Sequence, residues 1–475
     1  MITGVLLGAI LAAQKASPNF NEITVYNQGF GLVKEYRMLT LKQGRQTLAI
    51  ENVAAQIQPN TVGFKSVSEE GSINVLEQNY QYDLISTQAI LDKAVGSKIR
   101  LIRTLPNSTK EVVTGVLMSS PTAVVNSNGS TEQTYNGMVL KTDDGRIILD
   151  PTGEVEVDSI PEGLISRPTL LWDLDSSKAG DNTVELSYLT NGMSWSADYV
   201  LTIDEAAKAD LLGWVTMNNQ SGATFKNVRL KLLTGDVNQV RNRRSDEQLG
   251  LNLAVPAAKA APQFQEQGLF EYHLYTLQRP TTLNNKETKQ ISLLEGHGID
   301  VKKKLIIDST QDFGSYYPSE GVVAVGDFHP QVRLEFQNSK ENNLGMPLPE
   351  GTVKIYERDS GGSVQMLGED HIGHTPKDEK LSLVVGRSFD VVSTRKRLEF
   401  HRLGPSAFEE TFEISVRNHK DVNQEVNLLE RHYGDWEISG NSDPFTKEDA
   451  NTMQFVVNVP ANGTKVVRYT VTTRW

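Results

Sequence analysis

The sequence predicts a mainly β protein that consists of several antiparallel β-sandwiches, a small inserted SH3-like β-barrel and few helices. Three observations predict this fold class. Apolar and polar residues alternate with a period of two over many short stretches, as side chains do along a strand. Turn-forming Gly, Pro, Asn and Asp residues separate these stretches. The chain has 475 residues, which is too long for one hydrophobic core and predicts two to four domains.

The stretch 181–238 shows the alternation most clearly. At its first turn, Asn191 and Gly192 supply the positive φ angles that a tight hairpin needs. The polar residues between the apolar ones predict a sheet with one buried face, and the close succession of strands predicts a sandwich or barrel. Strands are expected around residues 184–188, 195–201, 211–217 and 228–232.

A signal peptide or N-terminal apolar segment is expected over residues 1–18. Residues 2–13 form an apolar run that suits the core of a signal peptide and is too short to span a bilayer. No Lys or Arg precedes the run, and no clean A-x-A site follows it. A short buried N-terminal segment is therefore the alternative.

Two modules are expected before the central sandwich. The first is a small sheet closed by one helix, with Ser86 as N-cap and Gly96 at the end of the helix. The second has five short strands spaced as in a small barrel. Its basic and aromatic residues could contact peptide or nucleic acid, but a structural insert is the favoured interpretation. They are Arg100, Arg103, Lys110 and Tyr135.

The second half of the chain is again rich in strand patterns. Before it, Arg241 and its neighbours form a basic cluster in a segment without periodicity, either a solvated loop or a contact to an acidic partner or to phospholipid headgroups. The expected organisation is 1–18 signal or apolar segment, 19–97 N-terminal β module, 98–165 small barrel, 166–239 central sandwich, 240–268 linker and 269–475 C-terminal sandwich region.

Several longer sequence words occur in a characteristic order. They include LSYLTNGMSWSADYVL, GWVTMNNQSGATFKNVRLKLLTGDVN, EYHLYTLQRPTTLNNKETKQISLL, NSKENNLGMPLPEGTVKIY and GEDHIGHTPKDEKLSLVVGRSFDVV. From about residue 23 to the last residue, the chain resembles the mucoidy-inhibitor-like family, a bacterial family of unknown function with a domain of unknown function on its C-terminal side. The resemblance implies β-rich, often exported proteins with no assigned catalytic residues. Many members have a long helical hairpin after the N-terminal strands, and this sequence has no heptad-bearing segment of that kind.

Composition limits the partners and the chemistry. The formal net charge of -12 argues against general nucleic-acid binding, which needs a basic surface. The chain has no cysteine, which excludes disulfides, thiolate chemistry and cysteine-ligated metals and fits an exported protein. Beyond residues 2–13, no stretch is long and apolar enough to predict a membrane span.

The search for catalytic motifs gives one weak metal candidate. The sequence contains no H-E-x-x-H, G-x-S-x-G or P-loop motif, so no catalytic residue and no cofactor are predicted. His371 and His374, with acidic residues on both sides, have the donor atoms that Zn²⁺ prefers. The same segment also suits a capped turn between two strands.

Two tryptophans are candidates for contact with a ligand. Trp195 and Trp214, with the tyrosines nearby, could form an aromatic platform on which a sugar stacks. Because they alternate with polar residues, packing in the core is the favoured interpretation.

The sequence therefore predicts a non-enzymatic, exported β-sandwich protein that binds or scaffolds in the bacterial cell envelope, in the periplasm or at the cell surface. The expected partner is a protein or envelope component, and exposed strand edges would allow it to add a strand. Three alternatives stay open: a hydrolase or metal-dependent enzyme with a site between the central and C-terminal regions, a carbohydrate-binding protein, and a cytoplasmic location.

Overall fold

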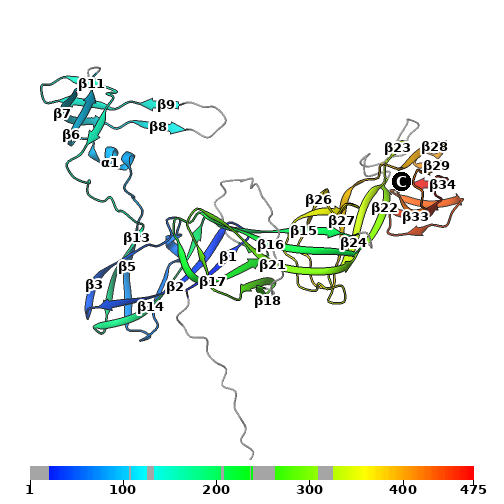
Figure 1. Cartoon of the computed structure of the whole chain (residues 1–475), viewed down its shortest axis with the longest axis horizontal. Helices are drawn as coiled ribbons and strands as arrows, with labels where there is room; N and C mark the ends of the chain where they lie inside the picture. The colour runs from blue at the N-terminus through cyan, green and yellow to red at the C-terminus, as the bar shows by residue number, and fades with distance from the viewer. Residues whose placement is uncertain are drawn as a thin grey trace, which may run out of the picture.

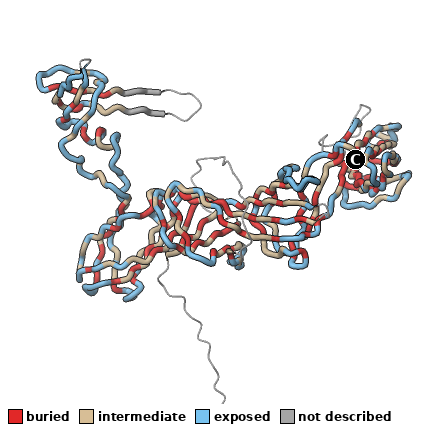
Figure 2. Tube along the Cα trace, in the orientation of Figure 1, coloured by how far each residue is buried: buried red, intermediate tan, exposed pale blue. Residues whose placement is uncertain are grey.

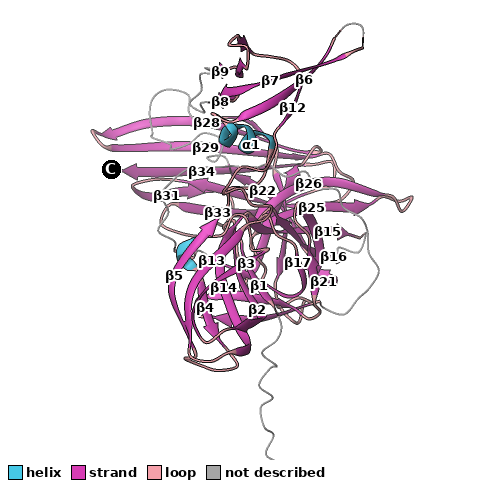
Figure 3. Cartoon of the chain, turned by 90° about the vertical axis from the view of Figure 1, so that its left-hand side faces the viewer, coloured by secondary structure: helices cyan, strands magenta, loops and turns pink. Residues whose placement is uncertain are grey.

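The protein is mainly β, as the sequence predicts, and its sandwiches follow one another along an elongated molecule (Figure 1). The structure is a computed structural model that describes residues 21–105, 108–125, 133–204, 208–235, 237–238, 263–308 and 325–475. The expected signal segment and the basic cluster at Arg241 lie outside these residues. Strands dominate the described chain (Figure 3), and buried positions run through the interior of the successive sandwiches (Figure 2).

An eight-stranded sheet and a three-stranded sheet form the N-terminal part. The larger sheet has the order β18-β19-β17-β1-β2-β14-β4, with β20 beside β17, and the smaller has the order β3-β13-β5. Strand β1 pairs with β17 in parallel. The strands are β1 (Glu22–Tyr26), β2 (Phe30–Leu41), β3 (Gly44–Glu51), β4 (Gly63–Ser66), β5 (Ile73–Gln81), β13 (Thr169–Ser176), β14 (Gly180–Asn191), β17 (Phe225–Thr234), β18 (Phe264–Leu269), β19 (Tyr272–Leu277) and β20 (Thr281–Leu283).

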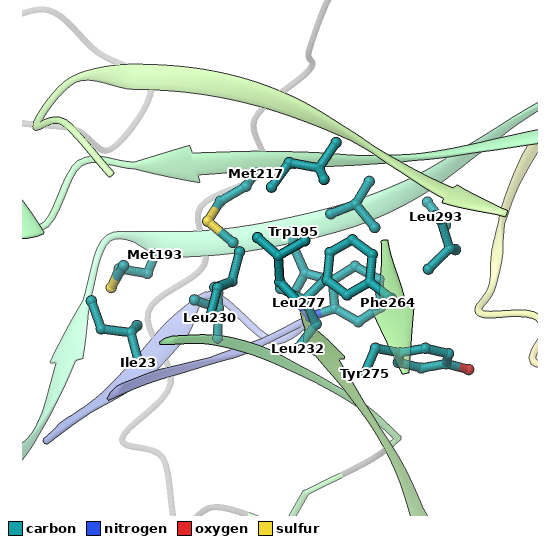
Figure 4. Packing of buried hydrophobic residues seen from close by; sticks show 14 of the residues in the cluster. Ile23, Met193, Trp195, Met217, Leu230, Leu232, Phe264, Tyr275, Leu277 and Leu293 are labelled. Atoms are coloured by element: carbon teal, nitrogen blue, oxygen red, sulfur yellow. The ribbon is translucent and has the colours of Figure 1, made fainter. Parts of the chain in front are cut away.

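A five-stranded sheet packs on the eight-stranded sheet. Its order is β21-β16-β15-β25-β26, and side chains from both sheets share one hydrophobic core (Figure 4). Strands before residue 240 therefore pair with strands after residue 268: β16 with β21, β15 with β25 and β17 with β19. The strands of this sheet are β15 (Met193–Ile203), β16 (Lys208–Asn219), β21 (Glu287–Asp300), β25 (Gly351–Arg358) and β26 (Val364–Ile372).

The hairpin predicted at Asn191 and Gly192 is wrong. Strand β14 belongs to the eight-stranded sheet and β15 to the five-stranded sheet, so the two strands that flank the turn are not partners. Gly192 has a φ of 74°, and a Cβ there would lie 2.8 Å from the Gln56 side-chain nitrogen. The dipeptide thus does reverse the chain, but it leads from one layer of the sandwich to the other.

The C-terminal part is a sandwich of two sheets. Their orders are β27-β24-β22-β30-β33-β32 and β23-β28-β29-β34-β31. The first sheet takes part in two cores, because Leu334 and Leu383 join the core of the preceding sandwich while Leu305 and Leu428 join the C-terminal core. The strands are β22 (Lys302–Asp308), β23 (Gly326–Phe328), β24 (Gln331–Gln337), β27 (Lys380–Arg387), β28 (Val391–Gly404), β29 (Ala407–Asn418), β30 (Gln424–Arg431), β31 (Asp435–Asn441), β32 (Thr446–Lys447), β33 (Thr452–Val459) and β34 (Thr464–Arg474).

A small unit branches from the N-terminal end of the molecule (Figure 1). The small β unit expected here is present, but its sheet, with the order β11-β10-β7-β6-β12, is open within the described residues and does not form a closed barrel. The predicted helix cap is confirmed, because the Ala89 N–H donates to Ser86 Oγ at 3.1 Å. The elements are α1 (Thr87–Ala94), β6 (Lys98–Thr104), β7 (Lys110–Ser119), β10 (Val139–Thr142), β11 (Ile147–Leu149) and β12 (Glu154–Glu156), besides the hairpin β8 (Thr122–Val125) and β9 (Gln133–Asn136) and a 3-10 turn at Pro59–Thr61 in the preceding module.

A charged network lies inside the C-terminal sandwich. The Arg395 guanidinium donates to the Glu430 carboxylate at 2.8 and 2.9 Å and lies 3.8 Å from the centre of the Phe412 ring. The Tyr469 hydroxyl also donates to Glu430. Burial, together with the Glu430 charge, raises the pKa of Tyr469 well above its ordinary value, so the phenol stays protonated. These contacts fix the position of β28 relative to β30 and β34.

We expect Glu430→Gln to destabilise the C-terminal sandwich by roughly 3–5 kcal/mol, because it removes the carboxylate charge that faces a buried arginine. Glu413→Gln is the matched control, since the partner of Glu413 is the exposed Arg468 and the loss should stay below about 1 kcal/mol. Hydrogen exchange of peptides from β28 and β34 measures both effects. Equal losses of stability in the two variants would contradict a stabilising role for the buried pair of Arg395 and Glu430.

A second prediction concerns His432, which is fully buried beside this network. Burial lowers the pKa of His432 to about 4; the Glu430 charge opposes this shift, and the Arg395 charge adds a smaller effect in the lowering direction. The unfolded chain binds this proton near pH 6.5, so the folded state loses about 3 kcal/mol as the pH falls from about 6.5 to about 4.

His432→Phe keeps an aromatic ring against Trp436 and Tyr469 and removes this titration. We expect its unfolding midpoint in urea to vary less than that of the natural chain between pH 7 and pH 4.5. Parallel pH profiles for the two proteins would show that His432 does not titrate as described.

Candidate binding site

A gap in the eight-stranded sheet forms the candidate site. Strand β1 lies between β2 and β17, and its first residue, Glu22, pairs with Lys34 on one side and Arg229 on the other. Both neighbours continue past this point, β2 over residues 35–41 and β17 over residues 225–228. In the described part of the chain, the two strand edges therefore face each other across a slot one strand wide.

The slot is a cavity of about 340 Å³. Its floor is apolar, because Ile23, Val33, Phe225 and Val228 are buried. Asn21 closes one end, where its side-chain oxygen accepts from the Tyr36 N–H and its carbonyl accepts from the Arg229 N–H, both at 2.9 Å. The lining residues are Asn21, Glu22, Ile23, Val33, Lys34, Glu35, Arg37, Asn52, Thr224, Phe225, Lys226 and Val228.

Charged side chains line the slot, and most of them are held by ion pairs. Glu35 points to the buried face of β2, where it accepts from Arg37 at 2.7 Å and from the Tyr188 hydroxyl at 3.4 Å. Burial and the nearby Glu35 charge raise the pKa of Tyr188 well above its ordinary value, so this hydroxyl remains a donor. Arg37 also donates to the Glu51 carbonyl at 2.7 Å, which ties the wall of the slot to β3.

The opposite wall is fixed in a similar way. Glu22 accepts from Arg229 at 3.0 Å and from Lys231 at 2.6 Å, so β1 and β17 are joined by charge as well as by the ladder. Lys226 is exposed at the rim. Two strand edges over an apolar floor can accept an extended polypeptide, which would gain main-chain hydrogen bonds from both walls and bury alternate side chains.

The predicted metal residues lie away from the slot: His374 contacts Thr234 at the far end of β17, and His371 is on β26 of the five-stranded sheet. The Glu350 N–H donates to His374 Nδ1 at 3.0 Å, and the Thr234 hydroxyl lies 3.1 Å from the same atom. With its Nδ1 as acceptor, a neutral His374 carries its proton on Nε2, which faces the Glu350 carboxylate at 3.7 Å. His371 is exposed on β26, and its backbone N–H donates to Asp370. Over the described ranges, no group of three or more His, Cys, Asp or Glu side chains is placed to hold a metal ion.

The two candidate tryptophans lie on opposite faces of one sheet. Trp195 is on the buried face of β15, where its indole N–H donates to the Leu233 carbonyl at 3.3 Å and its ring meets Tyr275 edge-on (Figure 4). Trp214, on β16, is half-buried on the other face, opposite Asp198. The structure does not bring these two rings together.

Sequence reasoning missed the slot. One signal was present, because Glu35 and Arg37 fall on the same face of β2 as the buried Val33, where an uninterrupted core strand would carry apolar residues. The other wall comes from a segment almost two hundred residues later, and nothing local connects the two.

Comparison with known proteins adds no relative. No protein-family model matches the chain, and no curated protein sequence matches it. Within the described residues, no helix is long and apolar enough to cross a membrane.

The two tryptophans should respond differently to truncation. We expect Trp195→Ala to destabilise the protein by roughly 3–5 kcal/mol, because it empties part of the shared core. Trp214→Ala should cost less than about 2 kcal/mol, since its side chain is half-exposed. Urea unfolding followed by circular dichroism gives both values, and similar losses would contradict the placement of the rings.

Proposed function

We propose that this protein is a non-enzymatic, exported binding or scaffolding protein of the bacterial cell envelope. Its slot between β2 and β17 takes an extended segment of a partner protein. The observation that carries the proposal is the gap between the edges of β2 and β17 above an apolar floor, as seen in the described part of the chain.

The geometry of the slot supports a polypeptide as the ligand. A peptide strand that continues the line of β1 meets main-chain groups of β2 and β17, which supply affinity, while the floor and the charged lining select its side chains. The walls are held by the Arg37 and Glu22 ion pairs before the partner arrives, so little ordering is required on binding.

The role in the envelope is supported by the sequence and by the shape of the molecule. The apolar N-terminal run, the absence of cysteine and the family resemblance are all typical of exported bacterial proteins. The elongated row of sandwiches, with a unit branching from one end, separates surfaces that could hold different partners (Figure 1).

Site-specific cross-linking in living cells tests the proposal. Because the chain has no cysteine, Lys226→Cys introduces a single thiol at the rim of the slot, to which a photo-reactive group can be attached. Lys42→Cys is the control, since Lys42 is exposed just beyond the far end of β2. We expect a reproducible adduct with one partner protein from position 226 and none from position 42.

The same cells test export. We expect the protein in the envelope fraction, with a new N-terminus after about residue 13 to 18. Identical adducts from both positions, or none from either, would contradict the slot as a partner site. A cytosolic protein that retains Met1 would contradict export, whatever the cross-linking result.

A further inference from the structure

Within the described residues, one edge of β28 has no strand partner over most of its length. Strand β23 pairs with β28 only at Ser393, Thr394 and Arg395. Over residues 396–404, β28 pairs in the described part of the chain with β29 alone, so one side of its backbone faces outward. The hairpin of β28 and β29 projects from the side of the molecule (Figure 3).

The exposed side chains at this edge are mostly basic and apolar, with one carboxylate, Glu399, which pairs with His401 at 3.7 Å. Lys396 and Arg402 are exposed, although the chain as a whole carries a net charge of -12. Leu398 and Leu403 are 48% and 57% exposed. Both leucines sit at irregularities of the ladder, where β28 has one residue more than β29.

The strand that carries the edge is held from its inner face. Arg395 pairs with Glu430, and Arg397 pairs with Glu410 at 2.9 Å. The Arg397 guanidinium also lies 4.8 Å from the centre of the Phe400 ring. The backbone of the edge is therefore ordered before any partner binds, which lowers the entropy cost of adding a strand.

We propose that the open edge of β28 binds an extended acidic segment of a partner protein as an added strand. Acidic side chains on that strand would pair with Lys396 and Arg402, and apolar ones next to them would cover Leu398 and Leu403. This site is independent of the slot, which lies in the N-terminal part of the molecule.

A second copy of the chain is a poor occupant of this edge. Two β28 strands that pair antiparallel about Glu399 bring Lys396 opposite Arg402 and Glu399 opposite its own copy. Like charges directly opposite each other destabilise a strand pair. The charge pattern thus favours an acidic partner over self-association.

Two labelled peptides test the proposal on the full chain: nine alternating Glu and Val residues, and the same peptide with Lys in place of Glu. Fluorescence anisotropy measures their binding at low and high salt. We expect the acidic peptide to bind, more weakly as salt screens the charges, and the basic peptide not to bind.

Two charge-matched double variants locate the site. Lys396→Glu with Arg402→Glu should weaken binding of the acidic peptide roughly tenfold. Lys340→Glu with Lys377→Glu changes the net charge equally at exposed lysines outside the C-terminal sandwich and should leave binding unchanged. In the natural chain, the acidic peptide should also slow hydrogen exchange of residues 396–404, a readout that needs no variant.

Several results would overturn the proposal. They are equal weakening in both double variants, equal binding of the basic peptide, and unchanged hydrogen exchange in β28. A change of oligomeric state in the β28 double variant would make a second copy the occupant. Tighter binding of a single-stranded oligonucleotide at the same edge would assign it to nucleic acid.

Discussion

The close approach of β15 and β25 is the constraint on which the rest of the structure depends. The two strands run parallel, with Ala197 opposite Gly351, and a Cβ on Gly351 would lie 2.1 Å from the Ala197 carbonyl oxygen. Only glycine therefore fits at position 351 of this strand pair. The Tyr199 hydroxyl donates to the Pro349 carbonyl at 2.8 Å and holds the start of β25 against β15 from inside the core. Through this contact, strands from the second half of the chain complete a sheet begun by the first half.

Long-range pairing of this kind recurs along the molecule. Three parallel pairs, β1 with β17, β15 with β25 and β22 with β30, each join segments more than a hundred residues apart. The loop closure that each pair requires is unfavourable in entropy, so the shared hydrophobic cores must offset it. Because the sheet of β24 and β27 enters two of these cores, adjacent sandwiches are joined by a common layer. The slot lies where the parallel pair of β1 and β17 ends, and the open edge of β28 lies where its antiparallel pairing with β23 ends.

Local pattern predicted the strands but not their partners. The alternation over residues 184–188 and 195–201 gave the correct buried faces, since Leu186, Tyr188 and Tyr199 are all in the core. The cap at Ser86 was also predictable, because it depends on residues three apart. The turn at Gly192 was not, because a positive φ reverses a chain in the same way within a sheet and between two sheets. Whether a sheet is open or closed, and whether a gap lies beside β1, depends on which distant strands pair. Local sequence patterns do not show this pairing.

The slot and the β28 edge share a feature that bears on selectivity. Strand β2 directs Glu35 and Arg37 inward beside the slot, and β28 directs Arg395 and Arg397 inward beside its edge. Apolar residues at these positions would give a core of similar stability, because a buried ion pair rarely exceeds a hydrophobic contact. They would also leave edges to which any apolar strand could add. Charged side chains that point inward at a strand edge disfavour the addition of an apolar strand. The apolar side chains of such a strand would lie next to the buried charges. The inward ion pairs are thus consistent with edges that remain open for a matching strand only.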